Sequence, residues 1–238
     1  EKYSKITIES FYKKYDNYPF LLGDSISLAN LGGNFGVIGN EAVTSSSSGR
    51  SYGIEFLAQR KLSKSFYGIL AYTWVRSEFK NKDDNYAPSA WDNGHIISLT
   101  GGLKLKNDWE IGMKFRFAGG SPYTPYDYAT SSLIQVWDAN SFGVFDYNNL
   151  NNQRLKANHG LDLRIDKKWF WKKVALNLYM DIQNLYNFQS ETQRSLIADQ
   201  DSNGNIIINP NDPSRYSLKY ISNVSGTVLP SIGLQFEF

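Results

Sequence analysis

An Asp- and Asn-rich segment late in the chain offers oxygen ligands at the spacing of a calcium-binding loop. Asp199, Asp201 and Asn203 occupy the first, third and fifth positions of an EF-hand pattern, and Gly204 occupies the sixth. Calcium prefers such oxygen ligands, and the glycine permits the sharp turn. The twelfth position is Pro210, however, instead of the bidentate Glu. The segment is therefore either an incomplete calcium candidate or a polar turn, and no other cofactor is predicted.

Nucleophilic catalysis would need a serine, a histidine and an acid in one place. The chain has two histidines, His95 and His159, and serines such as Ser98 and Ser121 lie near the same long polar segments. Nothing in their spacing fixes the geometry that defines a triad. We therefore predict that the protein is not an enzyme.

Composition excludes several other classes of protein. The 238 residues include 25 Lys and Arg, 23 Asp and Glu, and no cysteine. The near-zero net charge argues against a nucleic-acid partner, and the lack of cysteine excludes a disulfide scaffold or a thiolate metal site. A mean hydropathy of −0.43 and the absence of a long apolar run exclude a helical membrane span, but not membrane strands, which alternate. The chain opens without a leader, so we expect either that one was removed or that the chain is a piece of a longer protein.

Alternation of apolar and polar side chains predicts eight strands. The clearest is Trp109–Ala118, where Ile111, Met113 and Phe115 share one face. Roughly ten residues is the length of a tilted strand that crosses a membrane. The other seven are Lys5–Tyr15, Tyr52–Lys61, Phe66–Phe79, His95–Lys106, Leu161–Asp166, Val174–Gln183 and Ser231–Phe238.

The predicted connections alternate between short and long. Structureless loops of more than about 15 residues are rare in compact soluble domains. Short turns at one end of an antiparallel sheet and long loops at the other are typical of outer-membrane barrels. The short turns are Leu62–Ser65, Lys106–Asp108 and Phe170–Lys173, and the long loops are Asp16–Gly49, Lys80–Asp92, Gly119–Ala157 and Gln189–Ser225.

The two predicted faces differ in chemistry. A soluble sandwich also alternates, but it has no reason to place large aromatics beside its tight turns, as a membrane interface does. We expect a girdle of aromatic side chains at one membrane interface, formed by Tyr67, Trp109, Trp169, Phe170 and Trp171. The polar face would line the interior of a barrel, where it would contact a group inside it or only solvate the wall; it carries Lys104, Glu110, Lys114, Arg116, Asp162, Arg164, Asp166, Asp181 and Gln183.

Several segments together resemble the C-terminal half of TonB-dependent transporters of the Bacteroidota type, in the family's order. They are Glu9-Ser10-Phe11-Tyr12-Lys13, Gly53-Ile54-Glu55-Phe56, Tyr72-Thr73-Trp74, Trp91-Asp92-Asn93-Gly94-His95, Gly120-Ser121-Pro122-Tyr123-Thr124-Pro125, Asn151-Asn152-Gln153-Arg154, Leu161–Lys168 and Asp181–Asn187.

The resemblance implies a 22-stranded antiparallel barrel in the bacterial outer membrane, of which residues 1–238 would be the C-terminal eight strands. The remaining strands and the plug domain would lie in a separate chain or fragment. The resemblance also implies uptake of a scarce nutrient (a metal chelate, cobalamin, a glycan or a peptide), driven by TonB through the plug. A surface lipoprotein could be a further partner.

The last strand carries the most specific expected site. Ile232, Leu234, Phe236 and the final Phe238 alternate as in the C-terminal signal by which outer-membrane barrels are recognised for assembly. Aromatics in the long loops could stack on a ligand or pack the loops together; they are Tyr123, Tyr126, Tyr128, Trp137, Phe142, Phe145 and Tyr147.

Two other functions are compatible with the same pattern. One is a self-contained eight-stranded outer-membrane barrel with a structural or adhesive role, whose interior would be filled by side chains. The other is a soluble carbohydrate-binding β-sandwich. Strand closure would distinguish the first, and burial of the apolar face between two layers would distinguish the second.

Overall fold

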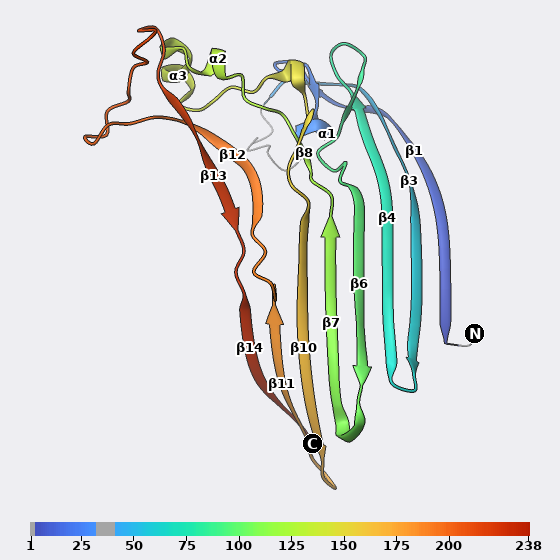
Figure 1. Ribbon diagram of the computed structural model, residues 1–238. Coiled ribbons are helices and arrows are strands. Elements are labelled where there is room, and N and C mark those ends of the chain that lie inside the picture. The colour runs from blue at the N-terminus through green and yellow to red at the C-terminus, as the bar shows by residue number, and fades with distance from the viewer. Residues whose placement is uncertain (1–2, 32–40) are drawn as a thin grey trace.

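The computed structural model describes residues 3–31 and 41–238 and is dominated by one curved antiparallel sheet (Figure 1). The sheet has ten strands in the order β14-β11-β10-β7-β6-β4-β3-β1-β2, with β5 paired to β4. All eight predicted strands are present. They are β1 (Ser4–Leu21), β3 (Val43–Ser63), β4 (Phe66–Lys80), β6 (Gly94–Lys104), β7 (Trp109–Ala118), β10 (Asn158–Phe170), β11 (Ala175–Gln183) and β14 (Leu229–Glu237).

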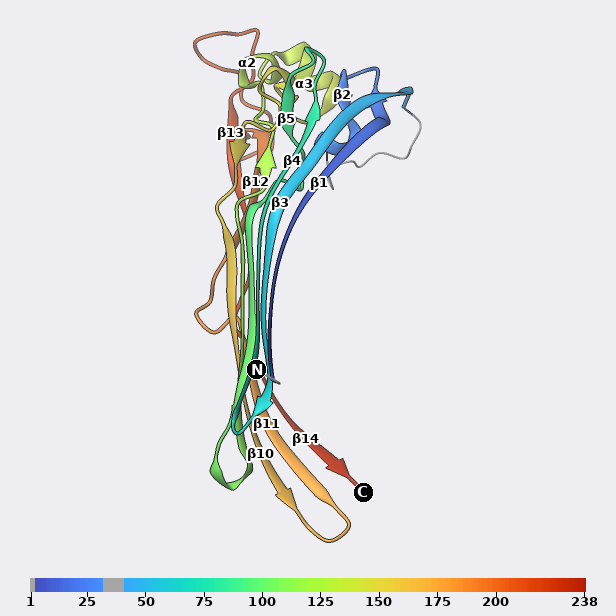
Figure 2. The same cartoon turned by 90° about the vertical axis from the view of Figure 1, so that its right-hand side faces the viewer.

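Short turns gather at one end of the sheet and long loops at the other, as Figures 1 and 2 show. The turn after β3 places Lys64 at a positive φ of 60°. The turn after β6 is a 3-10 segment, η2 (Lys106–Asp108), with Asn107 also at positive φ. The turn after β10 closes with a hydrogen bond from Trp171 N to Val174 O of 2.8 Å. The predicted alternation of short and long connections is therefore confirmed.

Strand register aligns the apolar side chains into rows on one face. Leu99 pairs with Leu70 on one side and with Phe115 on the other. Lower in the sheet, Ile165 pairs with Ile111 and Met180. Because paired residues point to the same face, these rows form a continuous apolar surface across the strands. It is open to its surroundings: Ile6, Ile8 and Ile232 are 69–75% exposed.

Aromatic side chains bound this apolar face at both ends. Near the short turns, Trp109 and Trp169 belong to its rows and are 44% and 37% exposed. Near the long loops, Tyr52 lies between Tyr12 and Trp74, at ring separations of 6.3 and 6.0 Å. Aromatic rings at both edges of an apolar band are the pattern of the two membrane interfaces.

The height of the apolar band agrees with a bilayer. Ten residue steps separate Trp169 from His159 on this face of β10. At about 3.3 Å per residue they cover roughly 33 Å of strand. A strand tilt of about 40° reduces this to roughly 25 Å along the membrane normal, the height of the apolar band in outer-membrane barrels.

Two residues of the predicted girdle lie on the other face. The Tyr67 hydroxyl donates a 2.6 Å hydrogen bond to Glu110, and both residues are in the polar phase. Phe170 pairs with Ala175 and continues the phase of Asp166. The prediction was wrong for both because closeness to a turn does not fix the direction of a side chain, whereas register does.

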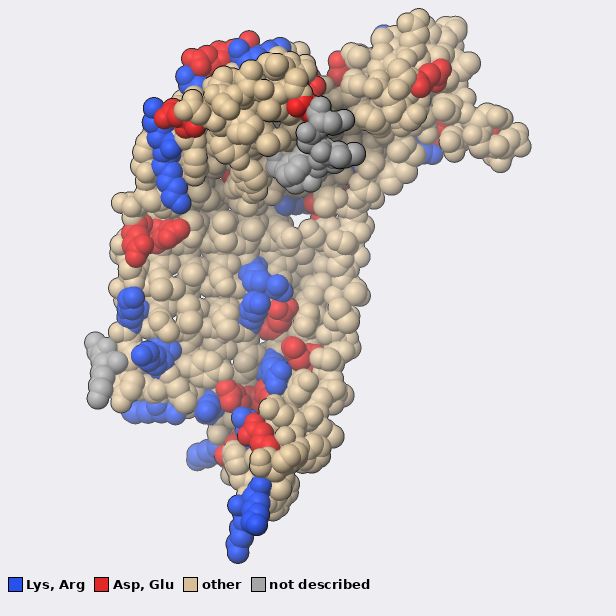
Figure 3. Space-filling view, turned by 180° about the vertical axis from the view of Figure 1, so that it is seen from behind, with Lys and Arg blue, Asp and Glu red and all other residues tan. Residues whose placement is uncertain are grey.

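The polar face carries a layer of charged groups, visible among the uncharged atoms in Figure 3. Arg116 donates to Asp162 at 2.8 Å. Asp166 accepts from Arg164 at 2.8 and 2.9 Å and from Asn177 at 2.9 Å. These contacts cross-link the wall.

On the same face, four aromatic rings lie over glycines of the neighbouring strand. Each ring is directly opposite its glycine, in the pairs Phe11–Gly53, Phe79–Gly49, Tyr67–Gly102 and Tyr179–Gly233. A Cβ atom on any of these glycines would lie 2.3–2.9 Å from the ring, closer than real atoms approach. These positions therefore require glycine.

The four long loops contain secondary structure of their own. The first contains β2 (Ile26–Ser27) and α1 (Leu28–Leu31), and the second contains β5 (Tyr86–Pro88). The fourth forms the hairpin β12 (Ser190–Ala198) and β13 (Leu218–Ser225), which the sequence prediction missed. The third contains β8 (Pro122–Tyr123), α2 (Tyr128–Ser131), α3 (Ile134–Asn140), η3 (Tyr147–Asn149) and β9 (Gln153–Arg154).

Within the described residues the sheet is open. β14 pairs with β11 alone, and β1 pairs with β3 and the short β2, so the outer edges of β1 and β14 do not meet.

Among the described helices, none has the length and apolar character needed to cross a membrane.

Candidate functional site

The long loops form a cap held by two small apolar cores. The first core joins Leu21, Ile26, Ala87 and Leu150, which come from the first, second and third loop regions. The second core joins Trp137 of the third loop to the β12–β13 hairpin; its buried members are Trp137, Leu196, Ala198 and Leu218. Because the third loop contributes to both cores, it connects the whole cap.

Buried polar contacts fasten the third loop to the second. The Asp92 side chain is fully buried, accepts a 2.9 Å hydrogen bond from Ser77 N, and lies 3.1 Å from Arg76 Nε. Arg154 forms an ion pair with the same carboxylate and also donates to the carbonyls of Asp92, at 2.5 Å, and Gly120, at 3.0 Å. Sequence reasoning quoted Asp92 and Arg154 only as parts of separate motifs and assigned no role to either.

A second fastening lies around Asn151. Its amide Nδ2 donates to the carbonyls of Asn30 at 2.7 Å and Pro88 at 2.8 Å, and its Oδ1 accepts from Thr124 at 3.1 Å. One side chain thus joins three of the long loops. Buried amides satisfied in this way fix the relative position of the segments that they connect.

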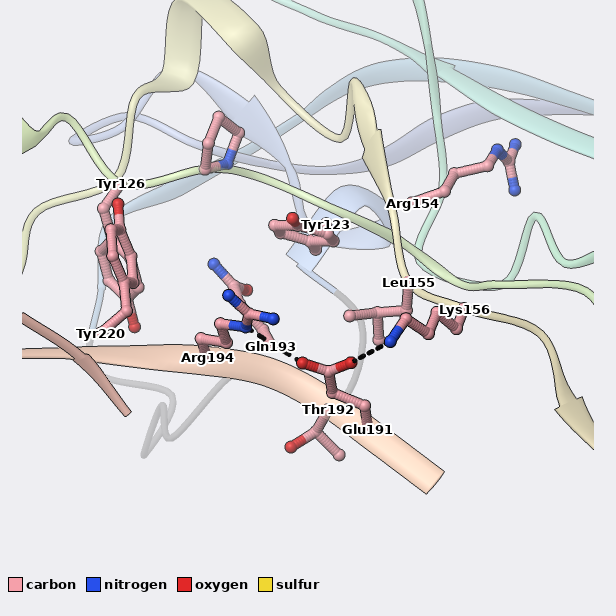
Figure 4. Close-up of a pocket in the computed structure, with 11 residues that line it drawn as sticks. Tyr123, Tyr126, Arg154, Leu155, Lys156, Glu191, Thr192, Gln193, Arg194 and Tyr220 are labelled. Atoms are coloured by element: carbon pink, nitrogen blue, oxygen red, sulfur yellow. Dashed lines mark hydrogen bonds and ion pairs between the residues drawn. The ribbon is translucent and has the colours of Figure 1, made fainter. Parts of the chain in front are cut away.

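The cap contains two adjacent cavities, both open to solvent, that share Tyr123, Leu155, Thr192 and Gln193. The first measures about 340 Å³ and is lined by charged residues and tyrosines (Figure 4). In it, Glu191 Oε2 lies 3.2 Å from Lys156 Nζ and Glu191 Oε1 lies 3.0 Å from Arg194 Nε. Hydrogen bonds from these two cations lower the pKa of Glu191.

The second cavity measures about 450 Å³ and is lined by two carboxylates, Asp24 and Glu41. Its wall also includes Asn30, Asn151 and Tyr147. Burial, together with the Asp24 carboxylate, raises the pKa of the Tyr147 phenol to about 12. Cavities of this size are typical of small-molecule sites.

The predicted ligand-contact aromatics divide between cavity and core. Tyr123 lines both cavities, and Tyr126 lines the first while stacking on Phe145 at 4.8 Å. Burial raises the pKa of Tyr126. Tyr128 is 45% exposed and donates to Leu218 O at 3.1 Å. Trp137 is only 7% exposed within the second core, so its ring offers little surface to a ligand.

The remaining three loop aromatics are also placed. Phe145 and Tyr147 line the second cavity, and Phe142 is 61% exposed.

The acidic turn of the fourth loop is held together by the protein itself. Asp199 Oδ1 accepts from Lys219 Nζ at 2.6 Å. Asp201 Oδ1 accepts from the backbone N–H groups of Asn203 and Asn205 at 2.8 and 2.9 Å. No cluster of three His, Asp or Glu side chains suited to a metal occurs among the described residues. Calcium binding at Asp199, Asp201 and Asn203 stays a prediction.

The histidines and serines are not brought together. His95 contacts the Tyr72 hydroxyl at 2.9 Å, and His159 contacts the Tyr186 hydroxyl at 2.6 Å, both on the apolar face. Ser98 pairs in register with Arg116 on the polar face. Ser121 donates to Asn93 at 2.8 Å.

The expected assembly signal lies on the apolar face of β14. Ile232, Leu234 and Phe236 pair with Met180, Leu178 and Leu176 of β11, and Phe238 is fully exposed. Its role in assembly stays a prediction.

Comparison with known proteins establishes the fold. No family model and no curated protein matches the sequence. Three solved structures are similar: the closed form of the ferric-catecholate import receptor Fiu from E. coli K12 (TM-score 0.51, 12% identity), the unliganded ferric citrate transporter FecA (0.53, 15%) and the ferripyoverdine receptor of the outer membrane of Pseudomonas aeruginosa, bound to ferripyoverdine (0.53, 12%).

These similarities cover 98%, 99% and 98% of this chain but only 26%, 29% and 25% of the matched chains. The chain therefore spans about a quarter of the length of the structures that it matches. By their names the three are an import receptor, a transporter and a receptor of the outer membrane, and the chain shares the fold of about a quarter of each.

Proposed function

We propose that this chain is the C-terminal part of the barrel of a TonB-dependent transporter in the bacterial outer membrane, of the Bacteroidota type. The observation that carries the proposal is the exposed apolar face, bounded by aromatics at both ends, with every long loop on one side. The fold shared with outer-membrane receptors supports it.

In this proposal the rest of the barrel completes the sheet at its two edges. The outer edges of β1 and β14 carry backbone groups without strand partners among the described residues. Such edges are not tolerated in lipid, so further strands would pair with them and close a 22-stranded barrel. A plug domain inside that barrel would receive energy from TonB, and a surface lipoprotein could cover the cap.

The cargo in this proposal is a scarce nutrient that enters through the cap. The similar structures are named for ferric catecholate, ferric citrate and ferripyoverdine. For this chain the candidates are a metal chelate, cobalamin, a glycan or a peptide.

The two alternatives lack such support. A closed eight-stranded barrel would pair β1 with β14, which the described sheet does not do. A soluble sandwich would bury its apolar face, yet Ile8 is 70% exposed and Leu234 is 60% exposed.

Site-directed spin labelling tests the proposal. These 238 residues contain no cysteine, and any cysteine elsewhere in the full-length protein is first replaced by serine so that each label is unique. Phe115→Cys and Lys114→Cys are adjacent residues on opposite faces of β7. In the full-length protein in liposomes, we expect oxygen to broaden the signal of the Phe115 label and a water-soluble nickel complex to broaden that of the Lys114 label. Equal exposure of both labels to the nickel complex would contradict a membrane barrel.

A further inference from the structure

The two cavities of the cap have opposite charge. Asp24 and Glu41 line the second cavity, whose described lining contains no Lys or Arg, and neither carboxylate has an ion-pair partner among the residues that the structure describes. The first cavity is lined by Lys156, Arg194 and Arg154, and Glu191 is the one acid in its described lining. One site therefore offers an acidic half and a basic half.

The two halves meet at Tyr123. Figure 4 shows its ring above Gln193 and Arg194, on the side of the first cavity, and the same residue also lines the second. The Arg154 side chain extends away from the cavity in that view, toward its contacts with Asp92 and Gly120. Lys156 and Arg194 are thus the cations available to a ligand, and Glu191 holds both in place.

A buried acceptor in the acidic half lacks a donor. Asn30 is 3% exposed and lines the second cavity, and its Oδ1 has no hydrogen-bond partner among the residues that the structure describes. An unsatisfied buried acceptor is costly. This oxygen lies behind the cavity surface, with less than 1 Å² of its area exposed, so a ligand N–H group would reach it only after a shift of the cavity wall. The raised pKa of Tyr147 agrees with a negative local field in the same cavity.

We propose, on the basis of the proposed transport function, that the ligand is a short peptide with free termini. Its ammonium group binds beside Asp24 and Glu41, its carboxylate binds beside Lys156 and Arg194, and Tyr123 packs against the chain between them. Thr124, Thr192 and Gln193 supply hydrogen-bonding groups along the same path. A neutral glycan would offer no charge to the Asp24 and Glu41 carboxylates, and none to Lys156 and Arg194, which share the single carboxylate of Glu191; this disfavours it.

Peptide libraries with blocked ends test both halves separately. The probes are four libraries of tetrapeptides: free, N-acetylated, C-amidated and doubly blocked. Binding to the purified full-length transporter is measured by equilibrium dialysis and mass spectrometry. We expect the free library to bind best and each block to weaken binding about tenfold, as for loss of a hydrogen bond to a charged group.

Paired variants test which cavity recognises each terminus of the peptide. Asp24→Asn with Glu41→Gln should weaken binding of the free library and remove the effect of N-acetylation while keeping the effect of C-amidation. Lys156→Gln with Arg194→Gln should also weaken binding of the free library, but it should remove the effect of C-amidation while keeping the effect of N-acetylation. Asp83→Asn with Asp108→Asn, and Lys172→Gln with Lys173→Gln, make the same charge changes away from both cavities and should leave binding unchanged.

The outcomes separate this inference from the transport proposal. Equal binding of all four libraries, or no binding of any, would overturn the peptide assignment. The spin labels at Phe115 and Lys114 report membrane insertion independently of ligand, so the transporter proposal would stand or fall on them alone.

Discussion

Arg154 and Asp92 lie 62 residues apart in sequence but form an ion pair in which the carboxylate is fully buried. The arginine reaches across from β9 and also binds two backbone carbonyls. Because Asp92 is in turn bound to Arg76 and Ser77 of β4, the third loop is fastened directly to the barrel wall.

Replacing this arginine should loosen the third loop. Arg154→Gln leaves the buried carboxylate with Arg76 alone, and we expect a local loss of about 2–3 kcal/mol, at the lower end for a broken buried pair because the Arg154 side chain is partly exposed. Hydrogen exchange of residues 121–126 and 150–155 measures it. Arg194→Gln, which removes an exposed pair with Glu191, is the control, and equal exchange in both variants would contradict the fastening.

The second loop core should depend on one indole. Trp137→Ala removes a buried ring between α3 and the β12–β13 hairpin, with an expected cost of about 3–5 kcal/mol to the packing of the cap. Protease cleavage between residues 199 and 217 on intact cells should accelerate. Phe142→Ala, an exposed aromatic of the same loop, should leave the cleavage rate unchanged, and a similar effect of both changes would show that Trp137 is not a core residue.

Arginine should be tolerated on only one face of β6. Leu99→Arg would place a charge in the lipid near the middle of the apolar band, at a cost of about 2–4 kcal/mol, whereas Thr100→Arg faces the lumen. The amount of assembled, heat-modifiable protein in outer membranes measures the difference. Equal assembly of the two variants would argue that the apolar face does not contact lipid.

Glycine should be required at 102 but not at 112. The two glycines are cross-strand partners on the polar face. An added Cβ at Gly102 would lie 2.4 Å from the Tyr67 hydroxyl, whereas at Gly112 its nearest neighbour would be a carbonyl at 3.9 Å. Gly102→Ala should displace the ring and lower the unfolding temperature, and Gly112→Ala should not. Tyr67→Ala added to Gly102→Ala should restore part of the loss.

Acid should weaken the start of α2. Asp127 caps this helix, and its hydrogen bonds with the side chain and the backbone N–H of Thr130 hold its pKa below the usual 3.8. A carboxyl with a lowered folded pKa stabilises above its unfolded value and loses that contribution as the pH falls through the folded value. Pepsin cleavage near residues 127–133 should therefore accelerate below about pH 4, where the cap, worth about 1 kcal/mol, is lost.

The cap variant provides the comparison. In Asp127→Asn the side chain does not titrate, so the rate of cleavage should lose this pH dependence while Asp83→Asn retains it. A parallel acceleration in all three proteins would mean that another group is responsible.

Alternation along the strands was sufficient to predict the wall. Both ends of the strand Trp109–Ala118 were predicted correctly, because alternation with a period of two can be recognised from the local sequence alone. The direction of Tyr67 was not predictable in this way, since Phe66–Phe79 is aromatic in both phases and the partner that selects the face, Glu110, lies 43 residues later.

The cap was predicted less well because its contacts are distant in sequence. Residues Ser190–Ala198 are mostly polar, and the apolar positions Leu196 and Ala198 become meaningful only when Trp137 packs on them. Asp92 and Arg154 carry no local signal of their pairing. The acidic and basic cavities likewise arise from residues as far apart as Asp24 and Arg194.

The rings over glycines have a consequence for how the wall is built. A slip of one residue between two strands would move the apolar side chains of the shifted strand to the polar face, so the alternation alone disfavours it. A slip of two would preserve that pattern, but it would drive Tyr67 against Thr100 or Lys104 in place of Gly102. The four ring–glycine pairs therefore disfavour a slip of two residues, which the alternation of apolar and polar side chains alone would allow.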